Sequence, residues 1–260
     1  VDIIVCDLHL GTNKKNGFEL YQELQYRKMV SACAVFLLIS ADATRPIVLG
    51  SLEHKPDDYL LKPFSQAQLK SRLNKSWQRK QYFLNVLQAM NKQEYAAANE
   101  ALDKLKDMPA PYQRLALEIR LEILWHENQY EKALTLLNSH SDQLPTQWAQ
   151  LALGKTYLAM HKFGDAIQCA NKVLALNQFD PEALDILAQA KSASQQPEEA
   201  LEDIRRAIKN SPYSLQRQIL ASRIARDNND YELLTEATKA TWQLSKNTIF
   251  KQVNYWCNHI

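Results

Sequence analysis

Glycine is scarce in this sequence, with 5 glycines among 260 residues. Because glycine supplies the backbone conformations that open loops and sharp turns need, its scarcity favours a mostly helical chain with short connections. Long apolar runs are also missing, and the longest is far shorter than the roughly 20 residues of a membrane-spanning helix. The sequence therefore predicts no membrane segment, and no secretory signal peptide is visible in it.

Metal-binding and redox motifs are missing as well. The six histidines are scattered, and no two of them stand at the helical spacing that a metal site uses. The four cysteines have no CxxC spacing, which favours reduced core thiols in a cytoplasmic protein. They are Cys6, Cys33, Cys169 and Cys257.

Charge of neither sign is in excess, since 31 Lys and Arg stand against 29 Asp and Glu. Overall charge therefore gives no reason to expect a nucleic-acid partner. One stretch departs from this balance, because no acidic residue and seven basic residues lie between Tyr59 and Gln93. We interpret it as a solvated helix face, or one that pairs internally with the repeats described below. The residues expected on that face are Arg72, Lys75, Arg79 and Lys80.

Three apolar runs near the start of the chain each end in a polar residue of a different chemical type. These end residues are Asp7, Ser40 and Lys62, and the runs are residues 3–6, 35–39 and 59–61. If the runs are parallel strands, the three side chains meet at the carboxyl edge of one sheet, where open α/β sheets place their sites. A carboxylate, a hydroxyl and an ammonium suit the capture of a phosphoryl group, because aspartate is a competent nucleophile and lysine pairs with the transferred charge.

These residues, together with Gly17 and the sequence Lys62-Pro63-Phe64, resemble the receiver domain of bacterial two-component response regulators. The resemblance implies that Asp7 is phosphorylated, that Ser40 binds a phosphoryl oxygen and that Lys62 pairs with the phosphate. It also implies that Tyr59 is a switch whose rotamer follows phosphorylation, and that the Lys62–Pro63 peptide is cis. Mg²⁺ would be held by the Asp7 carboxylate and the backbone carbonyl of His9. The implied partner is a sensor histidine kinase or a phosphotransfer protein.

Two features depart from the receiver pattern. Ten residues separate Asp7 from Gly17, which is more than usual, and His9-Leu10-Gly11 replaces the common Met-Pro. The paired acidic residues that complete the Mg²⁺ site of a receiver are absent, and Asp2 cannot replace them because it precedes its own strand. Because Val1 is not an initiator methionine, we interpret the chain as a fragment that lacks the first strand, the first helix and the second strand. On its own it would bind Mg²⁺ weakly or not at all.

We assign residues 1–75 to this receiver part, with helices expected at about 17–29, at about 44–54 and from Ser65 onward. Neither glycine nor proline occurs between Ser65 and Pro109. The last helix therefore either runs on as a connector into the next domain or breaks near residues 74–80, and the sequence leaves both possibilities open.

Residues 76–260 repeat themselves with a period near 34. An aromatic residue or a proline, followed three positions later by alanine or leucine, recurs at intervals of 35, 33, 34 and 34 residues. This period is typical of stacked helix–turn–helix units. The small residue would let the two helices approach closely, and the aromatic residue would fill the space between them. The copies begin at Tyr95, Tyr130, Phe163, Pro197 and Tyr231.

The clearest copy contains Leu153-Gly154, Tyr157, Phe163 and Ala166, and it resembles the tetratricopeptide repeat (TPR). The resemblance covers about residues 79–245 in five units, with 241–260 as the first helix of a sixth unit or a cap. It implies that the first helix of each unit lines a concave groove for a protein or peptide. The residues expected in that groove are Glu118, Glu122, Trp125, Trp148, Lys155, Asp185, Gln189, Arg223 and Arg226.

The sequence thus predicts a partial flavodoxin-like α/β receiver with a parallel sheet, followed by an all-α TPR superhelix. We expect a response regulator with a protein-binding output rather than an enzyme, with neither a nucleic-acid nor a membrane partner. A constitutive scaffold whose receiver is no longer phosphorylated remains as the alternative. A phosphatase of the haloacid-dehalogenase type is disfavoured, because His9 occupies the place of the second aspartate that such enzymes need.

Overall fold

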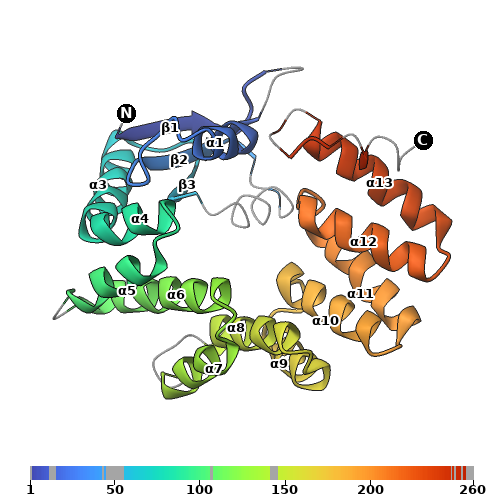
Figure 1. The fold of residues 1–260 in the computed structure, drawn as a ribbon. Coiled ribbons are helices and arrows are strands. Elements are labelled where there is room, and N and C mark those ends of the chain that lie inside the picture. The colour runs from blue at the N-terminus through green and yellow to red at the C-terminus, as the bar shows by residue number, and fades with distance from the viewer. Residues whose placement is uncertain are drawn as a thin grey trace. The chain divides into compact units, whose positions relative to one another are not determined.

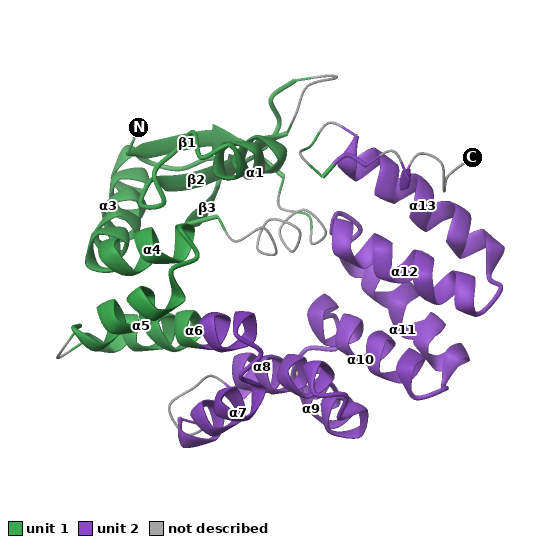
Figure 2. Ribbon diagram, in the orientation of Figure 1, with its two compact units in different colours: residues 1–120, 247–250 green, residues 121–246, 251–260 purple. Residues whose placement is uncertain are grey.

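The computed structural model describes most of the chain, namely residues 2–11, 16–42, 44, 56–105, 108–140, 146–246, 248, 250–252 and 254–255. Apart from Thr44, the helix expected at about 44–54 lies outside the described residues. In the part that is described, no helix is long and apolar enough to cross a membrane. The chain divides into two compact units, residues 1–120 with 247–250 and residues 121–246 with 251–260 (Figure 2).

The first unit begins with a parallel sheet of three strands in the order β1-β2-β3 (Figure 1). The strands are β1 (Ile3–Asp7), β2 (Val35–Ser40) and β3 (Asp58–Leu61). In their register Asp7 lies beside Ile39, and Ser40 lies beside Leu61. The prediction of three parallel strands is therefore confirmed, and their carboxyl ends meet at one edge.

Helix α1 (Gly17–Tyr26) packs against one face of this sheet. Its Phe18 and Tyr21 join a buried cluster with Phe36 and Leu38 of β2, and the rings of Tyr21 and Phe36 stack with their centroids 4.2 Å apart. Asn16 begins the helix, because its side-chain oxygen accepts hydrogen bonds from two first-turn amides. Alternate residues of a strand point to opposite faces, so the fully buried Val35 and Leu37 lie on the other face.

Helix α3 (Gln66–Tyr82) contacts β2 and β3, and it begins at Ser65 as expected. Its basic residues pair with the acidic residues at the start of β3. Arg72 lies 3.0 Å from Asp58, and Lys80 lies 3.1 Å from Asp57. Arg79 also donates a hydrogen bond of 2.8 Å to the Asp57 carbonyl. The expectation of a solvated face or of pairing with the repeats was therefore wrong for these three residues, which tie α3 to the sheet.

The connection to the repeats runs through Phe83. Helix α3 continues through the expected boundary at residue 75, without a break at residues 74–80, and α4 (Leu84–Asn91) follows Phe83 directly. Phe83 is fully buried and meets the Tyr112 ring edge to face at 5.9 Å. The Cys33 thiol donates a hydrogen bond of 3.7 Å to the Leu84 carbonyl. The sheet and the first repeat are therefore packed together in one unit.

The rest of the described chain consists of paired helices in sequence order, which confirms the five predicted repeats. The pairs are α4 with α5 (Tyr95–Asp103), α6 (Ala110–His126) with α7 (Tyr130–Ser139), α8 (Thr146–Ala159) with α9 (Phe163–Leu176), α10 (Pro181–Ala193) with α11 (Pro197–Asn210), and α12 (Leu215–Asp227) with α13 (Tyr231–Ser245). The expected start of a sixth unit at Thr241 was wrong, because Thr241 lies inside α13.

The repeated small residue packs as predicted. Ala98, Ala133, Ala166 and Ala200 each have 0% of their surface exposed, because each lies where the second helix of a pair crosses the first. The aromatic position is less uniform. Tyr231 is 70% exposed, so it does not fill the space between its helices, and the prediction for that copy was wrong.

A second periodic feature lies in the turn inside each pair. Two positions before each repeated aromatic or proline, the backbone adopts a left-handed conformation with φ between 56° and 61°. The residue after it donates a hydrogen bond to a carbonyl five positions earlier, as Gln196 does to Lys191 at 3.0 Å. This is the Schellman arrangement that closes a helix end. The left-handed residues are Gln93, Asn128, His161, Gln195 and Asn229.

We expect Gln195→Gly to stabilise the protein, because Gln195 is exposed and its left-handed backbone costs a residue with a side chain more than it costs glycine. The free energy of unfolding should rise by about 0.5–1 kcal/mol in urea titrations. The control Ala193→Gly, in the last turn of α10, should lower it by a similar amount. A loss of stability in both variants would contradict the role of the left-handed turn.

The outer edge of β1 is unpaired within the described part of the chain. Hydrogen bonds from Leu8 N–H to the Ile39 carbonyl and from Val35 N–H to the Asp2 carbonyl, each 2.8 Å, orient the even-numbered residues of β1 toward β2. The backbone groups of Ile3 and Val5 therefore point away from β2. The side chains of these two residues are each 41% exposed. Such an edge is open to further pairing.

We expect amide hydrogen exchange along β1 to alternate, because only every second N–H is bonded to β2. The amides of Ile3 and Val5 should exchange quickly, and those of Ile4 and Cys6 slowly. Residue-resolved exchange measured by NMR on a proven monomer tests this expectation. Equal protection of all four amides would show that a further strand covers the edge.

Candidate functional site

The residues that end the three strands come together at the carboxyl edge of the sheet. Asp7 is the last residue of β1, Ser40 is the last residue of β2, and Lys62 follows β3 directly. The Lys62 N–H donates a hydrogen bond of 2.8 Å to the Ser40 carbonyl, which fixes the backbone after β3 beside the end of β2. The Lys62–Pro63 peptide is cis, as expected.

Asp7 is held by two donors. The Lys62 ammonium donates to Oδ2, and the backbone N–H of His9 donates to Oδ1 at 3.0 Å. The Lys62 hydrogen bond is the main cause that lowers the pKa of Asp7 below its ordinary value, and the His9 N–H acts in the same direction. The carboxylate is therefore fully ionised at neutral pH, as a nucleophile has to be.

The ion pair between Asp7 and Lys62 remains open to solvent, since the two side chains are 31% and 41% exposed. Because the folded state lowers the pKa of Asp7, the pair stabilises the fold above the ordinary aspartate pKa. That stability is lost as the pH falls through the lowered value. Exposed pairs of this kind contribute less than about 1 kcal/mol, so the pair contributes more to the chemistry of this edge than to its stability.

Ser40 and Tyr59 are linked through the backbone of Asp42. The fully buried Ser40 accepts a hydrogen bond of 3.0 Å from the Asp42 N–H through Oγ. The Tyr59 hydroxyl donates to the Asp42 carbonyl at 3.0 Å. The Asp42 carboxylate is exposed, and the Thr44 N–H lowers its pKa. No sequence pattern pointed to Asp42, which joins the two predicted residues.

The loop after β1 returns to the sheet at Gly17. The Gly17 N–H donates to the Leu8 carbonyl at 2.9 Å. A Cβ on Gly17 would lie 2.7 Å from the Asp7 carbonyl oxygen and 2.8 Å from Cδ2 of Leu38, which is closer than packed atoms can approach. Only glycine therefore allows this loop to approach the end of β1, next to the candidate nucleophile.

We expect Gly17→Ala to lower the free energy of unfolding by about 1–3 kcal/mol, because the added methyl group overlaps backbone and core atoms. Gly164→Ala is the matched control. Gly164 lies in α9 with no atom near its would-be Cβ, so alanine should stabilise the helix by up to about 1 kcal/mol. Urea unfolding of both variants tests this, and an equal response of the two would contradict the tight approach at Gly17.

The predicted Mg²⁺ ligands at this edge are the Asp7 carboxylate and the His9 carbonyl. Among the described residues, no group of three or more His, Cys, Asp and Glu could hold a metal ion. Mg²⁺ requires six ligands in nearly octahedral geometry, several of them carboxylate or phosphate oxygens when water does not supply them. One carboxylate and one carbonyl do not make such a site, so the residues present do not by themselves fit Mg²⁺.

The residues predicted for the groove lie on the first helices of their pairs, and four of them make specific contacts. Trp125 of α6 donates its indole N–H to Thr156 of α8 at 3.0 Å. Lys155 of α8 pairs with Glu182 of α10. Asp185 of α10 pairs with Arg217 of α12, and Glu118 pairs with Arg114 in the same helix at 2.8 Å. Glu122 and Trp148 are partly buried. Gln189, Arg223 and Arg226 are exposed.

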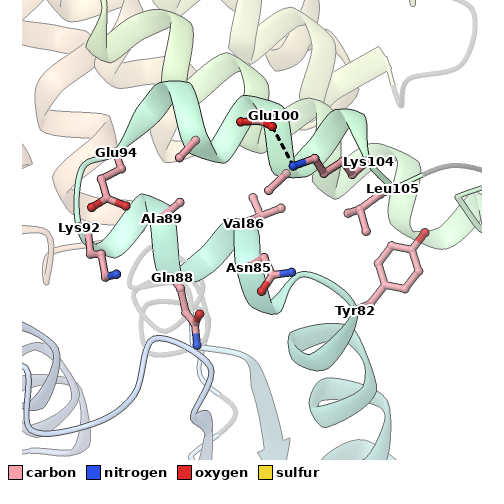
Figure 3. Close-up of a pocket in the computed structure, with 12 residues that line it drawn as sticks. Tyr82, Asn85, Val86, Gln88, Ala89, Lys92, Glu94, Glu100, Lys104 and Leu105 are labelled. Carbon is pink, nitrogen blue, oxygen red and sulfur yellow. Dashed lines mark hydrogen bonds and ion pairs between the residues drawn. The ribbon is translucent and has the colours of Figure 1, made fainter.

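A pocket of about 560 Å³ lies between α4 and α5 (Figure 3). Its lining includes Ala89, Ala97 and Ala101, whose small side chains leave the seam between the two helices open. In the fourth pair the equivalent positions hold Lys191, Glu199 and Asp203, and Lys191 pairs with both acids. The pocket wall also carries two cations and two anions, of which Lys104 and Glu100 pair at 2.8 Å. Its charge therefore selects no class of ligand.

Comparison with known proteins identifies the helical fold. No family model and no curated protein matches the sequence. Among solved structures, a thermophilic TPR protein of Thermus thermophilus, TTC0263, is similar over 69% of this chain and 98% of its own, with 10% identity and a TM-score of 0.58. PilF of Pseudomonas aeruginosa is similar over 73% of this chain and 87% of its own, with 18% identity and a TM-score of 0.50.

MamA of Desulfovibrio magneticus RS-1, from residue 41 to its end, is similar over 66% of this chain and 97% of its own, with 16% identity and a TM-score of 0.50. At these identities the likeness concerns the fold alone. Together with the five helix pairs, their buried alanines and their period near 34 residues, it shows that the helical region of this chain has the TPR fold.

Proposed function

We propose that this chain belongs to a two-component response regulator, in which Asp7 accepts a phosphoryl group and the TPR region binds a protein partner. The observation that carries the proposal is the contact between the Lys62 ammonium and Asp7 Oδ2 at the carboxyl edge of a parallel sheet. A low-pKa carboxylate beside a cation, with the Ser40 hydroxyl at the end of the adjacent strand, suits an acidic phosphoacceptor.

The reaction would transfer a phosphoryl group from the phosphohistidine of a sensor kinase or a phosphotransfer protein. An Asp7 carboxylate oxygen attacks phosphorus, a P–O bond forms, and the P–N bond to the histidine breaks. The released imidazole nitrogen keeps the electron pair and takes a proton from water. Lys62 would stabilise the charge on the transferred group, as positioned cations do in phosphoryl transfer. The product is an acyl phosphate on Asp7.

Mg²⁺ belongs to this proposal only for a longer chain that adds carboxylates to the same edge, because the residues described here do not form the site. The cytoplasm is the proposed location, since the buried Cys6, Cys33 and Cys169 are all free thiols. Neither the edge nor the repeats suggest an independent enzymatic activity. We therefore propose that the chain receives a phosphoryl group but catalyses no further reaction.

The output is proposed to be protein binding. TPR arrays present an extended surface to peptides and helices. The packed junction at Phe83 joins the sheet to the first repeat, so a change at the sheet edge could alter how α4 and α5 are presented. A two-state element can shift partner affinity only through different contacts in its two states, with coupling of typically about 1–3 kcal/mol.

The constitutive scaffold stays as a second candidate because the described residues hold no acidic cluster beside Asp7. In that case the sheet would serve only for docking, and Asp7 would remain unmodified. The two candidates make opposite predictions for a single measurement, the mass of the protein after exposure to a phosphodonor.

We expect the protein, in the full length in which its host makes it, to gain the mass of one phosphate when incubated with acetyl phosphate and Mg²⁺. Asp7→Asn should abolish the gain, whereas Asp42→Asn, which changes an exposed carboxylate of the same edge, should retain it. The 260-residue chain alone should react poorly. Intact-mass spectrometry reads the result within minutes, before the acyl phosphate hydrolyses.

A phosphate that persists in Asp7→Asn would contradict the assignment of the acceptor. No phosphate on the full-length protein would support the constitutive scaffold instead. Both variants alter a solvent-exposed side chain, so each should fold, and circular dichroism would check this.

A further inference from the structure

The first helices of the last three pairs form a row in which each helix contacts the next. Gln147 of α8 donates a hydrogen bond of 2.8 Å to Asp180, the N-cap of α10. Lys155 of α8 pairs with Glu182 of α10, and Arg217 of α12 donates to Asp185 of α10. One face of α8, α10 and α12 is therefore shared, and it belongs to a single compact unit.

The repeat period identifies equivalent positions on this face. Lys155, Gln189 and Arg223 follow one another at intervals of 34 residues, so they occupy the same place on α8, α10 and α12. Arg226 lies three positions after Arg223, within one helical turn of it on the same side. Asp227 comes next but points about 100° further around the helix.

Most of the charges on this face are already neutralised within the protein. Lys155 is engaged by Glu182. The Asp185 carboxylate receives two hydrogen bonds from the Arg217 guanidinium, of 2.8 and 2.7 Å. Arg217 is 3% exposed and also donates to the Ser211 carbonyl at 2.7 Å, so it is locked in place. The acids of α10 are thus engaged by cations other than Arg223 and Arg226.

Arg223 and Arg226 form no ion pair with any described residue, and both are exposed. One turn before Arg223, Ile219 offers a partly buried apolar side chain, and Gln189 adds an exposed amide on the neighbouring helix. Two uncompensated guanidinium groups beside an apolar contact and an amide define a surface, which we name the α12 surface. It consists of Gln189, Ile219, Arg223 and Arg226.

We propose that the α12 surface binds an acidic peptide segment of a partner protein, with its carboxylates on Arg223 and Arg226 and an apolar side chain on Ile219. The proposal rests on the proposed protein-binding role of the repeats and names the chemistry of the partner. Arginine suits this role because its planar fork donates two parallel hydrogen bonds to one carboxylate. Charge complementarity also raises the association rate and excludes basic partners.

The experiment uses the whole chain and a short fluorescent peptide in which Asp and Glu alternate with Leu. Fluorescence anisotropy should show saturable binding that weakens as salt rises. A matched peptide with Asn and Gln at the acidic positions should bind at least tenfold more weakly. The double variant Arg223→Glu/Arg226→Glu should also weaken binding of the acidic peptide at least tenfold, because it turns two attractions into repulsions.

Lys239→Glu is the control variant, since Lys239 is an exposed residue of the second helix α13 and carries the same change of charge away from the α12 surface. It should leave peptide affinity unchanged within twofold. Leu and Phe peptides without charge should not compete. A single-stranded oligonucleotide of equal charge should bind more weakly than the acidic peptide, because the surface has no aromatic side chain on which bases could stack.

Absence of binding, equal binding of the amide peptide, equal loss in Lys239→Glu or tighter binding of the oligonucleotide would each overturn the proposal. None of these outcomes bears on Asp7, whose phosphorylation is read by mass. Conversely, a protein that takes up no phosphate can still bind the acidic peptide. The failure of the α12 surface and the failure of the phosphoacceptor are therefore distinguishable.

Discussion

The parallel register of the three strands is the constraint on which the candidate site depends. Asp7, Ser40 and Lys62 are far apart in sequence, and they share an edge only because β1, β2 and β3 run in the same direction and end together. A slip of one residue in any strand would turn its side chains to the opposite face and separate Asp7 from Lys62. The buried cluster under α1 and the ion pairs of α3 hold that register from the two faces.

The repeats obey a more local rule. Each pair closes through a left-handed turn and a buried small residue, and the first helices α8, α10 and α12 are tied in sequence by specific side-chain contacts. Stacks of this kind are stabilised by neighbouring units alone, so their surfaces can vary while the fold is kept. The charged pairs between α8, α10 and α12 fix the stack and leave Arg223 and Arg226 available to a partner.

The elements that the sequence predicts are those whose cause is local or periodic. Strands that end in Asp7, Ser40 and Lys62, helix pairs at a 34-residue period and the alanines between them all leave a direct pattern. The sequence could not reveal that Asp57 and Asp58 neutralise the basic face of α3, or that Arg217 engages Asp185, because these partners meet only through tertiary packing. The left-handed turns were missed because Gln, Asn and His occupy them instead of glycine.

The contact between Lys62 and Asp7 is the central claim, and a pH titration of Asp7 tests it most directly. The ¹³C shift of the Asp7 carboxyl carbon would be followed by NMR in the native protein and in Lys62→Met, which keeps the length of the side chain and removes its charge. The account predicts a pKa below the ordinary aspartate value of about 3.9 in the native protein and a rise toward that value in the variant. An ordinary pKa in both proteins would show that Lys62 does not engage Asp7.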